Sequence, residues 1–111
     1  MSHPRRGDLV TVAVQGSFGK PRPALVIQSD LFNETHPTAM LCLVSSDLRD
    51  APLFRLTVSP TAENGLQLES QIQIDKVMTV LRDKLGPSFG RLDDATMLKV
   101  NRALALFMGI A

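Results

Sequence analysis

The sequence predicts one mainly β domain, a small barrel or strongly curled sheet that is followed by a C-terminal α-helix. Short apolar stretches of strand character are separated by turns rich in glycine and proline. After Gly90 the apolar residues change to helical spacing. The chain has 111 residues, of which 44% are hydrophobic, so it can bury a core without disulfides. Residues 1–111 are therefore expected to form a single α+β domain.

Strands are expected where β-branched residues recur or where apolar and polar residues alternate. The stretch at 38–44 is so apolar that both of its faces should be buried, with Cys42 as a small hydrophobic residue inside it. A single helical turn is expected near 31–33, in the loop before this strand. The expected strands are residues 9–14, 24–28, 38–44, 53–58 and 71–81.

The clearest alternation in the chain is Gln71-Ile72-Gln73-Ile74-Asp75. Because successive side chains of a strand point to opposite faces, the two isoleucines should share one face and the three polar residues the other. The apolar phase changes after this segment, so we expect a β-bulge near Lys76. One interpretation of the three polar side chains is that they form the solvated face of the strand.

One helix is expected at the C-terminus. Asp93 and Asp94 can cap its first turn and complement its dipole, and Gly109 can end it. Between them lies an apolar stripe at spacings of three and four residues, formed by Met97, Val100, Leu104 and Phe107.

The charge and the motifs exclude several classes of function. The net charge is +1, which is too balanced for binding nucleic acid by bulk electrostatics, so any such contact must use a local patch. One cysteine and two histidines make a poor metal site and exclude an internal disulfide. No cofactor motif is present, and no apolar run is long enough to span a membrane. We expect a cytoplasmic protein that needs no cofactor or metal.

The most informative segment surrounds Arg22, which lies between Pro21 and Pro23 and is followed by an apolar run. Proline restricts its own φ and disfavours helix at the residue before it, so Lys20 and Arg22 should be held extended in a loop that leads into a strand. A guanidinium presented in this way suits a phosphate, which accepts paired hydrogen bonds. The alternative is an edge-of-strand arginine that faces water.

The order of motifs along the chain resembles that of a known family. A first strand opens with Arg6-Gly7-Asp8-Leu9-Val10, and a second with Arg22-Pro23-Ala24-Leu25-Val26-Ile27-Gln28. Pro37-Thr38-Ala39 leads into a very apolar strand, and Ser70 to Asp75 and Thr79-Val80 precede a Gly-x-Leu-Asp segment and the last helix. This order is similar to the MazF/PemK-like toxins of bacterial toxin–antitoxin modules, over nearly the whole chain.

The resemblance implies an SH3-like barrel of the CcdB/MazF type that forms a homodimer. It also implies a metal-independent endoribonuclease that cuts single-stranded RNA. In that reaction the 2′-hydroxyl of the RNA attacks the neighbouring phosphate and leaves a cyclic phosphate and a free 5′-hydroxyl. The implied partner is a cognate antitoxin, an acidic and partly disordered chain that blocks the RNA groove.

The resemblance assigns catalytic roles to three residues. Arg22 matches the family's catalytic arginine, which can stabilise the charge that builds up on phosphorus and help to protonate the leaving oxygen. Ser45 stands where the family often has a threonine, and it keeps the hydroxyl but loses the β-branch that fixes the rotamer. Its alternative role is to end the strand in a turn. Asp75 matches an acidic position that helps as a base or organises the site.

Three further residues are expected to bind RNA, namely Phe18, Lys20 and Gln73. Phe18 can stack on a base, or alternatively fold back onto its own barrel. Gln73 stands where the PemK branch has a basic residue, so the arrangement of that branch does not carry over to this chain.

Two other functions stay open from the sequence. The chain ends in Leu106-Phe107-Met108-Gly109-Ile110-Ala111, which is similar to the tail with which CcdB-type toxins contact DNA gyrase. A gyrase inhibitor of that type is one alternative. The departures at Ser45 and Gln73 allow another, a catalytically degenerate toxin that only binds its antitoxin.

Overall fold

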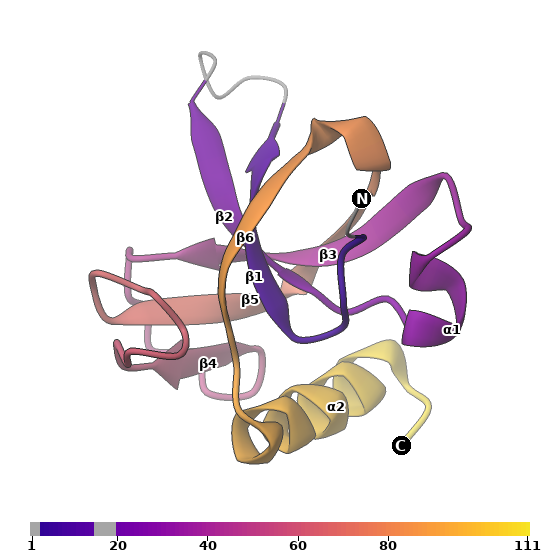
Figure 1. Ribbon diagram of the computed structural model, residues 1–111. Helices are drawn as coiled ribbons and strands as arrows, with labels where there is room; N and C mark the ends of the chain where they lie inside the picture. Colours follow the sequence, from indigo (N-terminus) through magenta and orange to yellow (C-terminus); the bar gives the residue numbers. More distant parts are fainter. Residues whose placement is uncertain (1–2, 15–19) are drawn as a thin grey trace.

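A computed structural model of the chain describes residues 3–14 and 20–111. Figure 1 shows a strongly curled sheet with a long helix along one side. The elements in chain order are β1 (Asp8–Ala13), β2 (Pro21–Val26), α1 (Asp30–Asn33), β3 (Thr38–Ser45), β4 (Arg55–Val58), β5 (Ser70–Leu81), the 3-10 turn η1 (Arg82–Lys84), β6 (Leu85–Arg91) and α2 (Asp94–Met108).

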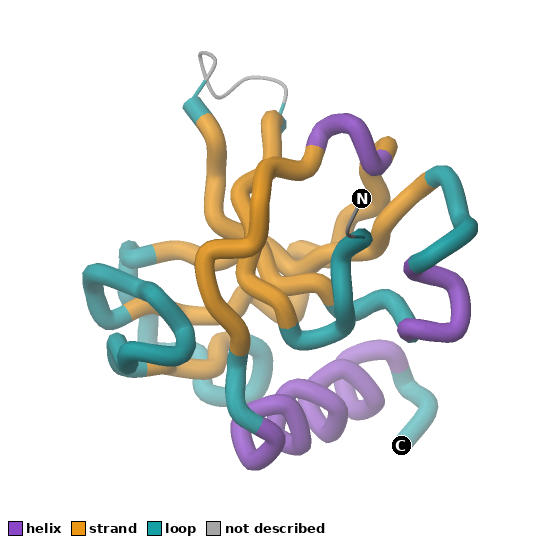
Figure 2. Tube along the Cα trace, in the orientation of Figure 1, coloured by secondary structure: helices purple, strands orange, loops and turns teal. Residues whose placement is uncertain are grey.

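The described strands form one antiparallel sheet in the order β4-β5-β3-β2-β1-β6. The sheet curls until the loop after β4 reaches β6, where the Arg91 N–H donates to the Glu63 carbonyl at 2.9 Å. The contact is so close that a Cβ on Gly90 would lie 2.2 Å from the Asn64 carbonyl oxygen. Figure 2 shows the resulting open, barrel-like arrangement. The predicted fold class is therefore confirmed.

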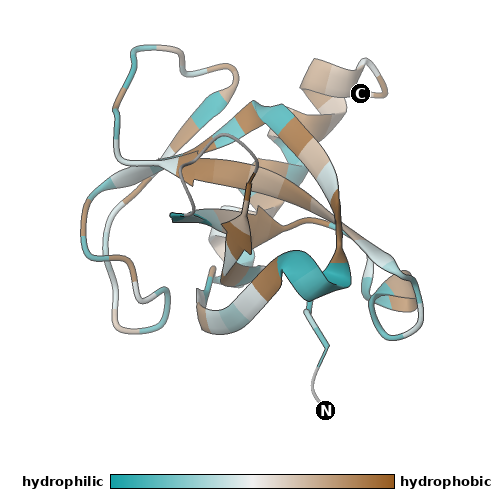
Figure 3. Ribbon diagram, turned by 90° about the horizontal axis from the view of Figure 1, so that it is seen from above, coloured by the Kyte–Doolittle hydropathy of each residue, from teal (hydrophilic) through white to brown (hydrophobic). Residues whose placement is uncertain are grey.

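Two clusters of buried side chains fill the protein. The helix-covered core lies between the sheet and α2, whose Met97, Val100 and Leu104 it includes, and Leu25, Cys42 and Ile72 join it from the strands. The second core lies within the curl of the sheet and consists of Val10, Val12, Ala24, Val26, Ala39 and Leu41. Figure 3 shows hydrophobic residues concentrated along the central strands, as expected for a sheet buried on both faces.

Strand β2 begins earlier than the sequence predicts. It starts at Pro21 rather than at Ala24, so Arg22 lies inside the strand and pairs with Val12 of β1. The expected extended backbone at Arg22 is confirmed, but its placement in a loop is wrong. The strand tolerates these prolines because β2 pairs with β3 only from Ala24 onward, so at Pro21 and Pro23 it pairs with β1 alone.

Strand β6 is absent from the sequence-based prediction because Gly86, Pro87 and Gly90 are typical of turns rather than strands. The structure gives a reason for the two glycines. A Cβ on Gly86 would lie 2.1 Å from the Thr11 hydroxyl oxygen, and a Cβ on Gly90 would collide with the neighbouring loop. The register between β1 and β6 is irregular, which is common at the rim of a barrel.

The expected bulge in β5 is confirmed. Cys42 pairs with Val77 while Val44 pairs with Ile72, so the additional residues of β5 lie opposite Leu43. Ile72 and Ile74 share the helix-covered core, as the alternation predicts. Cys42 is fully buried, as expected, and burial raises the pKa of its thiol to about 12.

The C-terminal helix follows the predicted pattern. The Asp93 carboxylate accepts from the Thr96 N–H at 2.7 Å, and Gly109 ends the helix in the left-handed conformation with φ +77°. Phe107 stays half exposed and contacts the ring of Phe54 instead of entering the core fully. No helix within the described residues is long and apolar enough to cross a membrane.

Candidate active site

Two of the predicted site residues, Arg22 and Ser45, lie on the neighbouring strands β2 and β3. The pairing of β2 with β3 runs from Ala24, opposite Leu43, to Val26, opposite Leu41, and its register extended two residues beyond this pairing leads from Arg22 to Ser45. Ser45 pairs in turn with Gln71 of β5, and Gln71 pairs with Thr57 of β4. Side chains opposite one another in an antiparallel sheet share a face. We refer to Arg22, Ser45, Gln71 and Thr57 as the site row.

The site row lies on the face of the sheet that is opposite to α2. Along β2 the side chains of Ala24 and Val26 belong to the second core, and Arg22 follows them in the same alternation. Along β3, Leu41 and Leu43 lead in the same way to Ser45. The site row therefore stands where the apolar lining of the second core ends and polar side chains begin.

The guanidinium that carries the functional hypothesis is accessible. Arg22 and Lys20 are both exposed, at the start of β2. Burial of Arg22 in an internal ion pair would contradict a phosphate-binding role, and the structure does not bury it. Figure 1 shows this end of β2 extending away from α2, so the helix does not obstruct access to it.

Ser45 ends β3 and starts a tight turn. Its Oγ accepts the Asp47 N–H at 3.0 Å, which fixes the side chain through a lone pair. A hydroxyl can donate its proton at the same time, so Ser45 can still donate to a phosphate oxygen. The strand-ending turn and the functional role, which the sequence leaves as alternatives, are thus compatible in one residue.

Asp75 lies in the bulged part of β5, opposite the middle of β3. Its Oδ2 is 3.9 Å from the Lys76 ammonium, and its side chain is 23% exposed. Its Oδ1 is buried and accepts no hydrogen bond from any residue that the structure describes. An unsatisfied buried acceptor is uncommon. Burial and, to a smaller extent, the Asp75 charge raise the pKa of the Cys42 thiol, which belongs to the helix-covered core.

The polar residues of β5 are not all solvated. Gln71 is only 5% exposed, so the interpretation of residues 71, 73 and 75 as a solvated face is wrong for Gln71. Gln73 is partly exposed, and its Oε1 accepts from an Arg55 Nη2 at 3.2 Å. Phe18, which the sequence suggests for base stacking, lies outside the described residues.

Arg55 is a candidate that the sequence analysis missed. It pairs with Gln73 across β4 and β5, and its guanidinium donates to the Asp47 carbonyl, to Gln73 and, at 3.4 Å, to Gln71. It therefore adds a second cation beside the site row. The alternation at 53–58 predicts the strand, but the sequence alone does not show which strand lies next to it.

Two hollows occur on the described surface, and the first is lined in part by Arg55 and by Thr57 of the site row. One, of about 800 Å³, is lined by β4, the loop that follows it and the start of α2. The other, of about 1040 Å³, lies between the N-terminal segment, η1 and β6. Neither includes Arg22, Ser45 or Asp75. Within the parts of the chain that the structure describes, no group of three or more histidine, cysteine, aspartate or glutamate side chains could hold a metal ion.

Comparison with known proteins shows the family of the chain. The profile of the PemK-like, MazF-like toxin of type II toxin–antitoxin systems matches residues 5–108. The chain belongs to this toxin family. It is 45% identical over 108 residues to the probable endoribonuclease MazF of Mycolicibacterium smegmatis, covering 96% of this chain and 98% of that protein. It is 28% identical to the endoribonuclease EndoA of Bacillus subtilis, over 96% and 95% of the two chains.

Solved structures of MazF toxins share the fold. A mycobacterial endoribonuclease in complex with its cognate antitoxin superimposes with a TM-score of 0.82 at 24% identity, over 97% of each chain. The Mycobacterium tuberculosis toxin MazF-mt6 superimposes with a TM-score of 0.81 at 17% identity, over 94% of this chain and 98% of that one. The match of the family profile and the 45% identity to a probable endoribonuclease MazF confirm the family assigned from the sequence, and they favour the nuclease branch over the CcdB type.

Proposed function

We propose that this protein is a metal-independent endoribonuclease toxin that cuts single-stranded RNA, including mRNA, in the cytoplasm. The observation that carries the proposal is that Arg22 is exposed on β2, the strand that neighbours β3, which ends at Ser45. The chain also belongs to the MazF-like family. The relative that is 45% identical and matched over 98% of its length is named as a probable endoribonuclease, which supports the same activity here.

In the proposed reaction the substrate's 2′-oxygen forms a bond to the neighbouring phosphorus and the bond from phosphorus to O5′ breaks. The proton of the 2′-hydroxyl goes to a base, and our candidate for it is the Asp75 carboxylate, whose side chain is 23% exposed. Arg22 stabilises the negative charge on the phosphate oxygens and donates a hydrogen bond to O5′, which takes its proton from a water molecule as the bond to phosphorus breaks. Ser45 holds a non-bridging oxygen through its hydroxyl proton. The products are a 2′,3′-cyclic phosphate and a 5′-hydroxyl.

The RNA would pass over Arg22 and Ser45, with contacts from Lys20 and Gln73 and with Phe18 available to stack on a base, and it would not reach Gln71 or Thr57. Two further parts of the proposal follow from the family. The toxin forms a homodimer of about twice 12.1 kDa, and an acidic, partly disordered antitoxin inhibits it by covering the cations near Arg22.

The decisive experiment uses labelled single-stranded RNAs of varied sequence in the presence of EDTA. The wild-type protein should cut them and leave a cyclic phosphate, and a 2′-deoxy substitution at the cleaved position should abolish the cut. Arg22→Ala should lower the cleavage rate by about 100- to 1000-fold, because it removes a donor to the developing charge. Its melting temperature should stay unchanged, since the side chain is exposed.

The matched control is Arg102→Ala, which removes an exposed arginine from α2 on the other side of the sheet. It should cleave RNA at the wild-type rate. Intact RNA with the wild-type protein would overturn the nuclease assignment, and so would equal rates for the two arginine variants. A supercoiling assay with DNA gyrase on the same preparation would then test the CcdB-type alternative.

A further inference from the structure

A buried carboxamide, that of Gln71, holds the end of the segment that follows Ser45. The Gln71 Oε1 accepts the Arg49 N–H at 2.9 Å, and its Nε2 donates to the Arg49 carbonyl at 2.9 Å. A side chain that bonds both backbone groups of one residue imitates the ladder of a neighbouring strand. The same carboxamide also donates to the Thr57 hydroxyl at 3.1 Å and accepts from Arg55. Gln71 therefore makes bonds with each of its polar atoms.

This arrangement continues to the Ser45 hydroxyl. Arg55 donates to the Asp47 carbonyl at 3.0 Å, and the Asp47 N–H donates to the Ser45 Oγ at 3.0 Å. The segment from Ser45 to Arg49 is thus fastened at its start by a hydroxyl, in its middle by a guanidinium and at its end by Gln71. Because Gln71 is only 5% exposed, water competes weakly for these bonds.

Ser45 lacks the β-branch of a threonine, so other contacts must fix the position of its hydroxyl. A threonine has a restricted χ1, whereas a serine can place its hydroxyl in several rotamers. In this chain the hydrogen bond from Asp47 selects the rotamer, and that bond persists only while the segment keeps its shape. The hydrogen bond from the Asp47 N–H therefore restricts χ1 of Ser45, as the β-branch would in a threonine.

We propose that Gln71 is a positioning residue that acts through Ser45, by holding the segment 46–49 so that the serine hydroxyl points at the phosphate. This inference rests on the proposed nuclease function. In this role Gln71 is buried, whereas the alternation predicts a solvated side chain. Gln71 does not contact the RNA in this proposal, so its substitution should leave substrate binding nearly unchanged.

The test compares Gln71→Leu, Ser45→Ala and the double variant in RNA cleavage. Gln71→Leu should lower kcat about tenfold with KM changed less than about threefold, because a misplaced group costs rate more than binding. In the Ser45→Ala background the same substitution should change kcat less than about twofold, since its target is already absent. The control Thr57→Val removes one partner of Gln71 but keeps both bonds to Arg49, and it should cleave at nearly the wild-type rate.

A second readout does not depend on activity. Hydrogen exchange of the Arg49 and Asp47 amides should accelerate at least about tenfold in Gln71→Leu and stay unchanged in Thr57→Val, with both proteins folded at the temperature of measurement. Unchanged exchange would overturn the inference, as would equal losses of kcat from Gln71→Leu with and without Ser45. If the wild-type protein does not cut RNA, both the proposed function and this role of Gln71 are wrong. If the wild-type protein cuts RNA but the losses of kcat in Gln71→Leu and Ser45→Ala add up in the double variant, only the role of Gln71 is wrong.

Discussion

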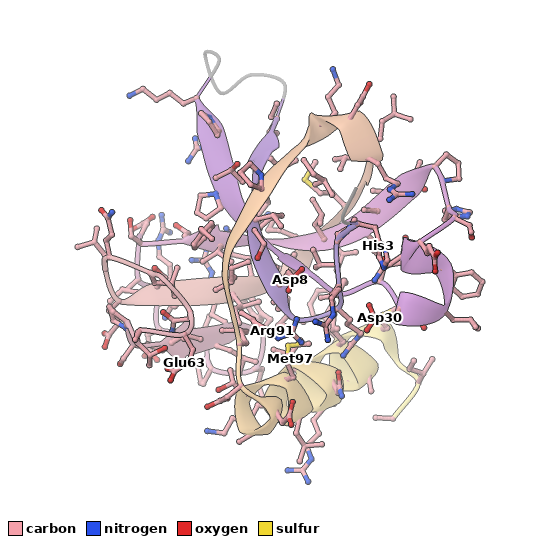
Figure 4. The ribbon with its side chains drawn as sticks, in the orientation of Figure 1. His3, Asp8, Asp30, Glu63, Arg91 and Met97 are labelled. Atoms are coloured by element: carbon pink, nitrogen blue, oxygen red, sulfur yellow. The ribbon has the colours of Figure 1, made fainter. Side chains whose placement is uncertain are left out.

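The ion pair between Asp8 and Arg91 joins the start of β1 to the end of β6 and gives the sharpest stability prediction. Figure 4 shows the two labelled side chains together, next to Met97 of α2. The Arg91 Nη1 donates to Asp8 Oδ1 at 2.6 Å, and its Nη2 donates to the Arg6 carbonyl at 3.0 Å. The Asp8 side chain is 11% exposed and the Arg91 side chain 41% exposed. Arg91→Met removes the cation and leaves the carboxylate nearly buried.

The expected loss follows from these exposures. Removing one partner of a fully buried pair costs about 3–5 kcal/mol, whereas exposed pairs contribute about 0–1 kcal/mol. Water can reach this carboxylate through the space that Arg91 occupied, and the Arg5 N–H still donates to Asp8 Oδ2 at 2.9 Å. We therefore expect Arg91→Met to lower the free energy of unfolding by about 2–3 kcal/mol. For a domain of this size the melting temperature should fall by about 10 °C.

The assay is thermal and urea unfolding followed by far-ultraviolet circular dichroism, with Arg102→Met as the control at an exposed position. The double variant Asp8→Asn with Arg91→Met should be more stable than Arg91→Met alone, because no buried charge then remains unpaired. RNA cleavage by Arg91→Met well below its melting temperature should match that of the wild type. A fall in melting temperature no larger than that of Arg102→Met would refute this account of the pair.

Two further predictions concern a thiol and two glycines. Burial holds the pKa of the Cys42 thiol at about 12, against 9.0 as its ordinary value, so the folded state keeps a proton that the unfolded chain loses at alkaline pH. Its contribution is fully present below pH 9 and falls by up to about 1.4 kcal/mol per pH unit as pH rises toward 12, so urea unfolding of Cys42→Ala should show a shallower alkaline decline than the wild type. Gly65→Ala should destabilise far more than Gly109→Ala in thermal unfolding. Both glycines have positive φ, which costs a side chain about 1–2 kcal/mol, but a Cβ on Gly65 would also lie 2.3 Å from the Phe89 carbonyl oxygen, whereas Gly109 has open space. Equal losses in the two glycine variants would contradict the proposed contact between the loop and β6.

Most of the fold could be predicted because the signals are local. The alternation at 71–75, the apolar run at 38–44 and the capped stripe of the last helix each depend on neighbours within a few residues. Strand β6 could not be predicted, since Gly86 and Gly90 are required by contacts with Thr11 and Asn64, which are distant in the sequence. The start of β2 was misplaced for a related reason, because pairing with β1 overrides the preference of its prolines.

The sequence by itself determined the family, the curled sheet with its terminal helix, and an arginine held extended between two prolines, because these depend on residue types and their order. Only the tertiary structure decided which side chains meet. Strand register places Ser45 opposite Gln71. The sequence predicts a solvated Gln71, but the curled sheet buries this side chain, which bonds the backbone N–H and carbonyl of Arg49. A pattern with a period of two specifies the face of each side chain but not the strand beside it, since the pairing depends on how the whole sheet closes.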